Sequence, residues 1–280
     1  MSDADTSCSL EQEQLPAPAS EFPTVSWNRE TPPSGARAVP EETAVAITYN
    51  GTTHAVMMAT PTDLEDYAIG FSLTEGQIQT ADQIRSIDVA AFEEGIDLRI
   101  WLDTETADSF RDRRRRIVGP TGCGLCGIES LMEAVPAPKK VVSDARFSAS
   151  TILKAQADMF ASQKLHAVTS AVHAAAWWTE GNGLVAVRED VGRHNALDKL
   201  TGALARGLRP DAPGLLLLTS RISVEMVQKA AVLGAPVIAA VSAPTALAIR
   251  VAEAAGITIV ATTRNDAFDV YTHRERIVME

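Results

Sequence analysis

The chain has 280 residues, 46% of them hydrophobic and 22% charged, so it can bury a core in one large domain or two modest ones. Its formal net charge of −11 disfavours nonspecific attraction to nucleic acid or to an anionic membrane surface. Three cysteines are too few for a disulfide-built secreted fold. We expect a globular protein with neither nucleic acid nor membrane as partner, in which a phosphate ligand needs a local basic pocket.

Residues 1–42 differ in composition from the rest of the chain. Six of the fourteen prolines lie in the first 40 residues, among Glu, Ser and Gln, a composition typical of flexible segments. The first 20 residues contain neither the basic region nor the apolar stretch of a secretory signal. We therefore expect a flexible leader over residues 1–42 and a cytoplasmic protein.

The pattern of residues 43–142 predicts a mixed α/β part with antiparallel hairpins. Alternating apolar residues on both sides of Asn50-Gly51 predict one hairpin. The sequence Thr62-Asp63-Leu64-Glu65 matches a capping box and predicts the start of an amphipathic helix. A second pair of strands is expected over residues 84–90 and 96–102.

Residues 143–280 predict an α/β part in which a mostly parallel sheet is covered by helices. Short apolar runs there alternate with segments of helical periodicity, which is the pattern of β-α-β units. The expected strands are residues 185–188, 215–219, 237–241 and 257–261, and the expected helices are residues 195–205, 223–233 and 245–255.

Polar residues follow the expected parallel strands at the point where each strand ends. Because these ends share one edge of the sheet, the loops at residues 220–223, 242–245 and 262–266 should lie together. Their hydroxyls, the helix N-termini, Arg221 and Arg264 suit a phosphate-bearing ligand, although the same residues also serve as helix caps.

A charged loop, residues 188–199, separates one expected strand from the following helix. In it His194 is either a satisfied structural histidine or a proton carrier or hydrogen-bond donor beside a site. Asn195 is a potential helix cap, and Asp198 and Lys199 are readily explained as surface polarity.

Two thiols, Cys123 and Cys126, lie within residues 119–127, where four glycines surround them. Such a loop can bring backbone N–H groups close to a sulfur anion, which suits a reactive thiolate or persulfide. Zinc would need further ligands, and no second Cys-x-x-Cys is present. A thioredoxin-type dithiol and a merely structural turn remain alternatives to sulfur carriage.

Several segments in the same order resemble the formate dehydrogenase accessory sulfurtransferases, the FdhD family. The resemblance rests on residues 57–76, the Cys123/Cys126 loop, and residues 172–177, 188–200, 219–230 and 241–248. It implies a cytidine-deaminase-like α/β fold, a homodimer and no permanently bound metal. The alternatives are a cofactor-binding chaperone without sulfur transfer and a Cys-x-x-Cys dithiol oxidoreductase.

The resemblance also implies a sulfurtransferase role. A cysteine desulfurase would load a persulfide on Cys123, with Cys126 as its partner thiol. The sulfur would then pass to the molybdenum (or tungsten) bis-guanine-dinucleotide cofactor that formate dehydrogenase requires. The implied cofactor-binding residues, together with those of the predicted sheet edge, are His194, Arg221, Thr262, Thr263, Arg264, Asn265, Asp266 and Ala267.

Overall fold

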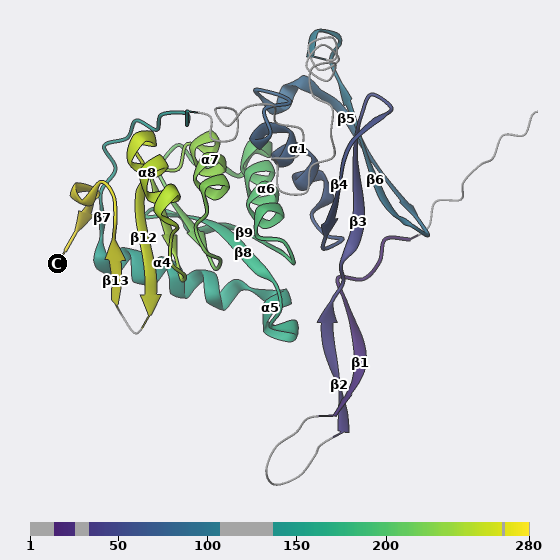
Figure 1. Ribbon diagram of the computed structural model, residues 1–280, viewed down its shortest axis with the longest axis horizontal. Coiled ribbons are helices and arrows are strands. Elements are labelled where there is room, and N and C mark those ends of the chain that lie inside the picture. Colours follow the sequence, from purple (N-terminus) through teal and green to yellow (C-terminus); the bar gives the residue numbers. More distant parts are fainter. Residues whose placement is uncertain (1–13, 26–33, 107–136, 265–266, 280) are drawn as a thin grey trace, which may run out of the picture.

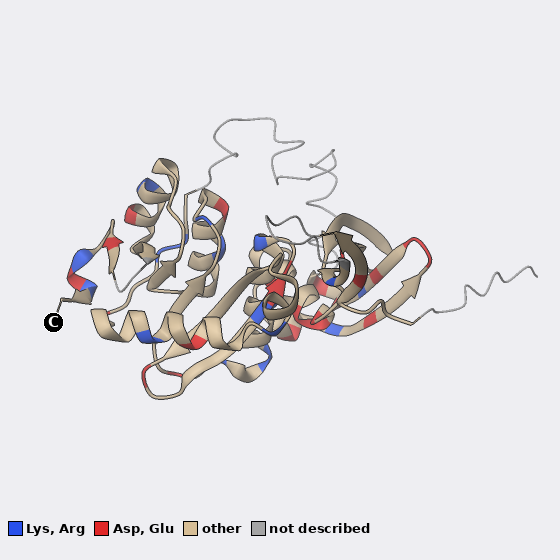
Figure 2. Cartoon of the chain, turned by 90° about the horizontal axis from the view of Figure 1, so that it is seen from below, with Lys and Arg blue, Asp and Glu red and all other residues tan. Residues whose placement is uncertain are grey.

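The computed structural model describes residues 14–25, 34–106, 137–264 and 267–279. These residues form a projecting two-stranded arm, a four-stranded sheet and a six-stranded sheet, with helices between the two larger sheets (Figure 1). Basic and acidic side chains are interspersed along the described elements (Figure 2). None of the described helices has both the length and the apolar character needed to cross a bilayer.

The arm consists of β1 (Ala19–Val25) and β2 (Ser34–Pro40), paired antiparallel over seven residue pairs from Ala19↔Pro40 to Val25↔Ser34. The prediction of a flexible leader is therefore wrong for these two strands. Proline-rich composition disfavours helices and central strands, but it is compatible with a free-standing hairpin. The arm leads directly into the four-stranded sheet.

The four-stranded sheet has the order β4-β3-β6-β5, with β3 and β6 parallel and the other pairs antiparallel. Its apolar face and the helix α1 (Leu64–Thr74) enclose one core cluster. Both predicted strand pairs are confirmed. The strands are β3 (Thr43–Tyr49), β4 (Thr52–Ala59), β5 (Ile84–Phe92) and β6 (Gly95–Leu102), and a short η1 (Ala81–Gln83) precedes β5.

Helix α1 begins differently from the prediction. Its N-cap is Asp63 in the left-handed conformation with φ 52°, and no side chain caps the helix. The Asp63 carboxylate instead lies 3.4 Å from the Arg188 guanidinium. Because α1 packs between the four-stranded sheet and another helix, it is buried almost all round instead of amphipathic.

The six-stranded sheet has the order β13-β12-β11-β10-β8-β9. Its strands are β8 (His173–Thr179), β9 (Gly183–Asp190), β10 (Leu215–Leu218), β11 (Val237–Ala240), β12 (Thr258–Arg264) and β13 (Ala267–Val270). Strands β10, β11 and β12 are parallel neighbours, whereas β8 and β13 pair antiparallel. The α/β class is confirmed, with the parallel part confined to those three strands.

Strand β8 was not expected, and it lies between β9 and β10. Because β8 is antiparallel to both, β9 still runs in the same direction as β10, β11 and β12. These four strands therefore end at one edge of the sheet. We call it the carboxyl edge.

Helices cover both faces of this sheet. On one face lie α6 (Arg193–Ala203), α7 (Val224–Leu233) and α8 (Ala246–Ala255), close to the predicted bounds; α4 (Ala149–Ser162) covers the other face. The remaining elements are α5 (Lys164–Thr169), η2 (Leu204–Leu208), η3 (Arg274–Arg276) and the pair β7 (Phe147–Ser148) with β14 (Ile277–Val278).

Candidate functional site at the carboxyl edge

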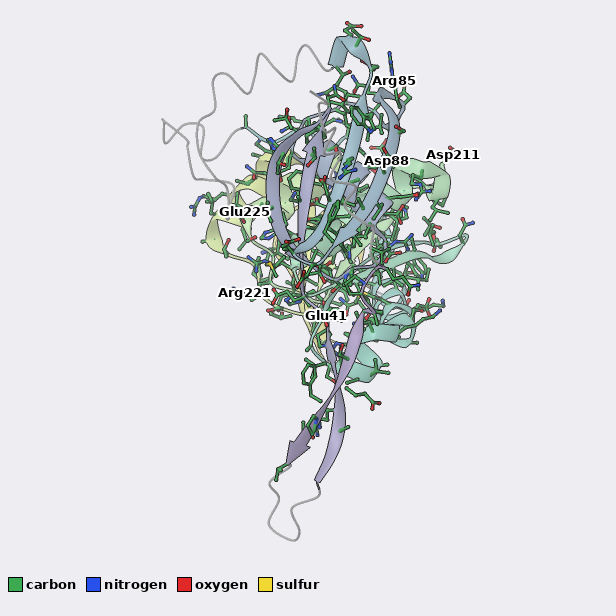
Figure 3. All side chains as sticks on the ribbon, turned by 90° about the vertical axis from the view of Figure 1, so that its right-hand side faces the viewer. Glu41, Arg85, Asp88, Asp211, Arg221 and Glu225 are labelled. Atoms are coloured by element: carbon green, nitrogen blue, oxygen red, sulfur yellow. The ribbon has the colours of Figure 1, made fainter. Side chains whose placement is uncertain are left out.

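The structure brings together the described residues of the predicted ligand edge. Helix α6 begins there with Arg193 and His194, and the loop that contains Arg221 leads into α7. The loops that follow β10 and β11 are joined, since Ile222 N donates to Ala243 O (3.3 Å) and pairs with Pro244 as an isolated bridge. Figure 3 shows Arg221 on the same side of the molecule as Glu225 of α7.

The end of β12 carries an irregular backbone. Thr262 has φ 57°, in the left-handed region that β-branched residues rarely adopt, and the pairing register with β13 shifts between Ala261 and Arg264. The Thr262 hydroxyl lies 2.5 Å from Asp269 Oδ2. Such strain is typical of sites where a fold fixes a backbone for function.

Thr263 is turned inward. Its side chain is buried, its hydroxyl accepts from Gln156 Nε2 at 3.1 Å, and it lies 3.3 Å from Ala240 O. Thr263 thus anchors β12 to α4 and β11, and its contact with a ligand stays a prediction. Ala267, which opens β13, is exposed. Asn265 and Asp266 lie outside the described residues, and Arg264 is described only as the last residue of β12.

Buried polar atoms without a hydrogen-bond partner are found at the start of α6 and in the first half of α7. Among the described residues they include Arg193 Nε, His194 Nε2 and Gln228 Nε2. Buried polar groups are normally hydrogen-bonded, so a cluster of unpaired ones marks a place where a ligand can supply the missing partners. The sequence does not predict a ligand contact for Arg193 or Gln228, because no local pattern distinguishes them from surface residues, whereas Ser223 belongs to the predicted edge loop of residues 220–223.

Two histidines at this edge are held neutral. Burial, followed by the charges of Arg193 and Lys229, lowers the pKa of His194 to about 4. Burial and Arg193 also lower the pKa of His173, which opens β8 opposite Asp190. Neutral imidazoles beside a guanidinium can accept or donate a hydrogen bond without adding positive charge. In the sequence, His173 stands out only as part of residues 172–177, one of the segments that carry the family resemblance.

The pKa of His194 has a consequence for stability. Because that pKa lies below the ordinary 6.5, the unfolded chain binds a proton between about pH 6.5 and 4 that the folded chain does not. The free energy of unfolding should therefore fall as the pH is lowered through this range. Between pH 7 and pH 4.5 we expect the free energy of unfolding to fall by about 1–2 kcal/mol less in His194→Gln than in the wild type, after allowance for partial solvent screening. Urea unfolding of both proteins at pH 7 and pH 4.5 measures the difference, and identical pH slopes would contradict it.

A fully buried network lies behind the start of α6. Lys199 Nζ is 2.6 Å from Asp190 Oδ2 and donates to Thr60 O at 2.8 Å, and both charged side chains are 0% exposed. Asp190 also accepts from the backbone N–H groups of Thr60 and Gly192 and from Asn195 Nδ2. The network therefore ties the loop before α6 to the end of β4.

The interpretation of this loop as capping and surface polarity is wrong. The N-cap of α6 is Gly192, without a side-chain cap, and Asn195, Asp198 and Lys199 are all buried. Asn195 instead accepts from the Tyr67 hydroxyl at 2.9 Å and donates to Met58 O at 2.8 Å. These side chains are buried because α1 covers this face of α6.

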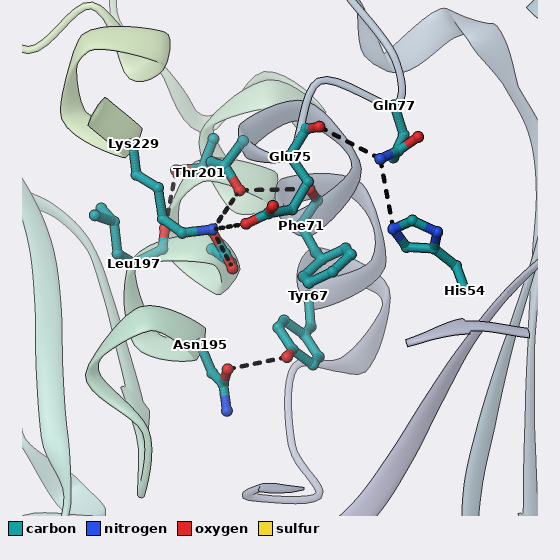
Figure 4. A network of polar contacts seen from close by, with 11 residues as sticks. His54, Tyr67, Phe71, Glu75, Gln77, Asn195, Leu197, Thr201 and Lys229 are labelled. Atoms are coloured by element: carbon teal, nitrogen blue, oxygen red, sulfur yellow. Dashed lines mark hydrogen bonds and ion pairs between the residues drawn. The ribbon is translucent and has the colours of Figure 1, made fainter. Parts of the chain in front are cut away.

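A second buried cluster surrounds Lys229 of α7 (Figure 4). Its ammonium donates to Asp198 Oδ1 at 2.9 Å, to Glu75 Oε1 at 2.7 Å and to Thr74 Oγ1 at 2.9 Å. The Asp198 and Glu75 carboxylates raise the pKa of Lys229 against the opposing effect of its burial. The cluster joins α1, α6 and α7, and so fixes the helices whose ends form the edge.

Cys123 and Cys126 lie outside the described residues. Within the described ranges no group of three or more His, Cys, Asp or Glu side chains is arranged to hold a metal ion. Fold and site thus define an α/β protein in which a layer of helices, cross-linked by buried ion pairs, supports a polar edge with unpaired hydrogen-bonding groups.

Comparisons with known proteins identify the family. The model of the FdhD/NarQ family matches residues 40–278. A protein named sulfur carrier protein FdhD from Agrobacterium fabrum is 50% identical over 254 residues, covering 89% of this chain and 92% of the relative. One of the same name from Cupriavidus necator is 47% identical over 265 residues, covering 95% and 92%. The chain belongs to the FdhD/NarQ family.

A solved structure supports the same family assignment and the same fold. The crystal structure of a protein from Desulfotalea psychrophila, assigned as a formate dehydrogenase accessory protein, superposes with a TM-score of 0.75 at 26% identity. The match covers 94% of this chain and all of the other. The fold and the family resemblance inferred from sequence are therefore confirmed.

Proposed function

We propose that this protein is a sulfurtransferase that matures a molybdenum or tungsten cofactor for formate dehydrogenase. It accepts sulfur from a cysteine desulfurase on Cys123 and passes that sulfur to a bis-guanine-dinucleotide cofactor held at the carboxyl edge. It works in the cytoplasm as a homodimer. The proposal is supported by the family, whose curated relatives are named sulfur carriers, and by the unpaired donors at the edge.

The loading step is an exchange between thiols. The Cys123 thiolate attacks the outer sulfur of the desulfurase persulfide, a new S–S bond forms on Cys123, and the desulfurase leaves as its thiolate. For release, the Cys126 thiol attacks the inner sulfur of the persulfide, which gives a Cys123–Cys126 disulfide and hydrogen sulfide. The Cys123 and Cys126 thiols together supply the two electrons that reduce the sulfane sulfur to sulfide. The sulfide takes the place of an oxygen ligand of the metal, and that oxygen leaves as water. A cellular dithiol then reduces the Cys123–Cys126 disulfide.

Mass spectrometry of the protein after incubation with a cysteine desulfurase and cysteine tests the loading step. We expect a mass increase of one sulfur on Cys123 in the wild type and in Cys126→Ala, and none in Cys123→Ala. Cys8→Ala is the matched control and should load normally. An unmodified Cys123 under conditions where the desulfurase carries persulfide would contradict the carrier role.

The carboxyl edge is tested by guanine-nucleotide binding. Arg193 has an unpaired, buried Nε beside His194, and a hydrogen bond from a charged donor is worth about 1.5–3 kcal/mol. We therefore expect Arg193→Gln to weaken GDP binding at least about tenfold while persulfide loading is unchanged. Arg250→Gln, on the exposed side of α8, is the control. Equal calorimetric affinities for wild type and Arg193→Gln would place the nucleotide elsewhere.

A further inference from the structure

A cavity of about 290 Å³ lies where three helices end. It is bordered by the turn that follows α1, by the end of α6 with the start of η2, by the last residues of α7 and by Lys139. Helices α6 and α7 begin at the carboxyl edge, and at ~1.5 Å per residue each is about 15 Å long. The cavity is therefore separate from the candidate nucleotide site.

Most of the cavity wall is apolar. Its larger apolar side chains come from all three helical segments, and they are Leu73, Ile78, Leu204, Val232 and Leu233. Ile78, Leu204 and Leu233 are only 2%, 3% and 5% exposed. Water in an apolar recess lacks hydrogen-bonding partners, so an apolar group of a ligand gains free energy by displacing it.

The threonine hydroxyls in the wall already have partners within the protein. Thr201 Oγ1 donates to Leu197 O at 2.8 Å. Thr74 Oγ1 donates to Asp198 Oδ1 at 2.7 Å and accepts from Lys229 Nζ at 2.9 Å. These hydroxyls therefore belong to the helix packing, and recognition of a ligand falls to the charged residues of the wall.

Both charged residues of the wall are cations, Lys139 and Arg209. Among the residues that the structure describes, no Asp or Glu lines the cavity, although acidic residues outnumber basic ones by 36 to 25 in the whole chain. Burial lowers the pKa of Arg209, and no described carboxylate opposes this shift. An anion in the cavity would supply the missing negative charge.

Neighbouring groups hold the Arg209 guanidinium in place. Its Nη1 donates to Leu233 O at 2.6 Å, and its central carbon lies 5.2 Å from the centroid of the Trp177 ring. The bond to Leu233 caps α7, but it uses only one of the guanidinium's N–H donors. The others can bind a carboxylate, and a cation that is already fixed loses little conformational freedom when it does so.

We propose that this cavity binds a small organic anion, a carboxylate with a short hydrocarbon body. Arg209 and Lys139 bind the carboxylate, and the apolar wall receives the hydrocarbon part. The volume is close to the lower limit of ligand sites, ~300 Å³, which suits such a molecule and is too small for a dinucleotide cofactor. The site goes beyond the proposed function, because sulfur transfer at the carboxyl edge does not require it.

Calorimetric titration of the full chain with hexanoate tests the proposal, with butyrate, formate and hexanol as comparison probes. Hexanoate should bind saturably at millimolar concentration. It should bind about tenfold more tightly than butyrate, because each buried methylene tightens binding about threefold to fourfold. Formate, which has no hydrocarbon body, and hexanol, which has no charge, should both bind more weakly than hexanoate. GDP should not compete with hexanoate.

Three variants locate the bound anion. Arg209→Gln should weaken hexanoate binding about tenfold and leave hexanol binding unchanged. Lys164→Gln, which removes an exposed cation of α5 outside the cavity, is the control and should change neither affinity. Ala205→Trp places a large side chain at the exposed rim and should abolish binding of both probes. It leaves the Arg209 cap of α7 in place, so it tests the location independently.

Equal affinities for hexanoate and hexanol would remove the role of the cations. Competition by GDP would place hexanoate at the carboxyl edge instead. Absence of saturable hexanoate binding, or unaltered binding in Ala205→Trp, would likewise overturn the proposal. Persulfide loading is independent of all these outcomes, so they leave the carrier role untouched.

Discussion

Replacing Lys199 with Met is expected to lower the free energy of unfolding by about 3–5 kcal/mol. The substitution leaves the Asp190 carboxylate 0% exposed and without its ammonium partner at 2.6 Å. It also leaves Thr60 O without the donor that now lies 2.8 Å away. Removing one member of a buried ion pair costs far more than the pair itself contributes, because the remaining charge stays desolvated.

Lys154→Met is the matched control. Lys154 forms a Lys–Asp pair of similar length, 2.9 Å to Asp158, but its side chain is 63% exposed. Exposed pairs contribute less than about 1 kcal/mol, so urea unfolding should separate the two variants clearly. If both variants lost a similar amount of unfolding free energy, burial of the Asp190–Lys199 pair would not make the loss of its partner more costly.

Gly202→Ala is expected to destabilise the protein by about 3 kcal/mol or more, although alanine favours helices over glycine by about 1 kcal/mol. A Cβ at this position would lie 1.8 Å from the backbone oxygen of Asp66 in α1. The reciprocal contact exists at Gly70, whose Cβ would lie 1.7 Å from Asp198 O. Because both obstacles are backbone atoms, only separation of α1 from α6 relieves the clash.

Gly181→Ala provides the comparison, since a Cβ there meets nothing within 4 Å. Its free energy of unfolding should match the wild type or exceed it slightly. Separation of α1 from α6 would also disturb the ion pairs that hold the carboxyl edge. Gly202→Ala should therefore weaken GDP binding as well, and a variant as stable as the wild type would contradict the close packing of these helices.

Local patterns predicted the elements around the site well. The helices α6, α7 and α8 and the strands β10, β11 and β12 have periodicities and lengths that belong to their own segments. Their shared direction followed from the β-α-β rhythm, and so did the gathering of Arg221 and Thr262 at one edge. These features depend on nearest neighbours along the chain.

Other features depend on contacts between distant segments. Lys199 and Asn195 have the charge and polarity of surface residues, and only their contacts with Thr60, Tyr67 and Met58, more than 120 residues away, explain their burial. Similarly, nothing in the alanine-rich β8 indicates that it inserts between β9 and β10. The roles of Cys123 and Cys126 came from residue chemistry and family resemblance, and they stay predictions.

The central claim is that this chain carries sulfur from a desulfurase to a cofactor bound at its carboxyl edge. Radiolabelled sulfur loaded from labelled cysteine and a desulfurase, followed after removal of the desulfurase and addition of the bis-guanine-dinucleotide cofactor, tests it directly. We predict that the label leaves the protein, appears in the cofactor and accompanies activation of formate dehydrogenase, and that Cys123→Ala/Cys126→Ala transfers none. Full activation of formate dehydrogenase with that double variant would contradict the account.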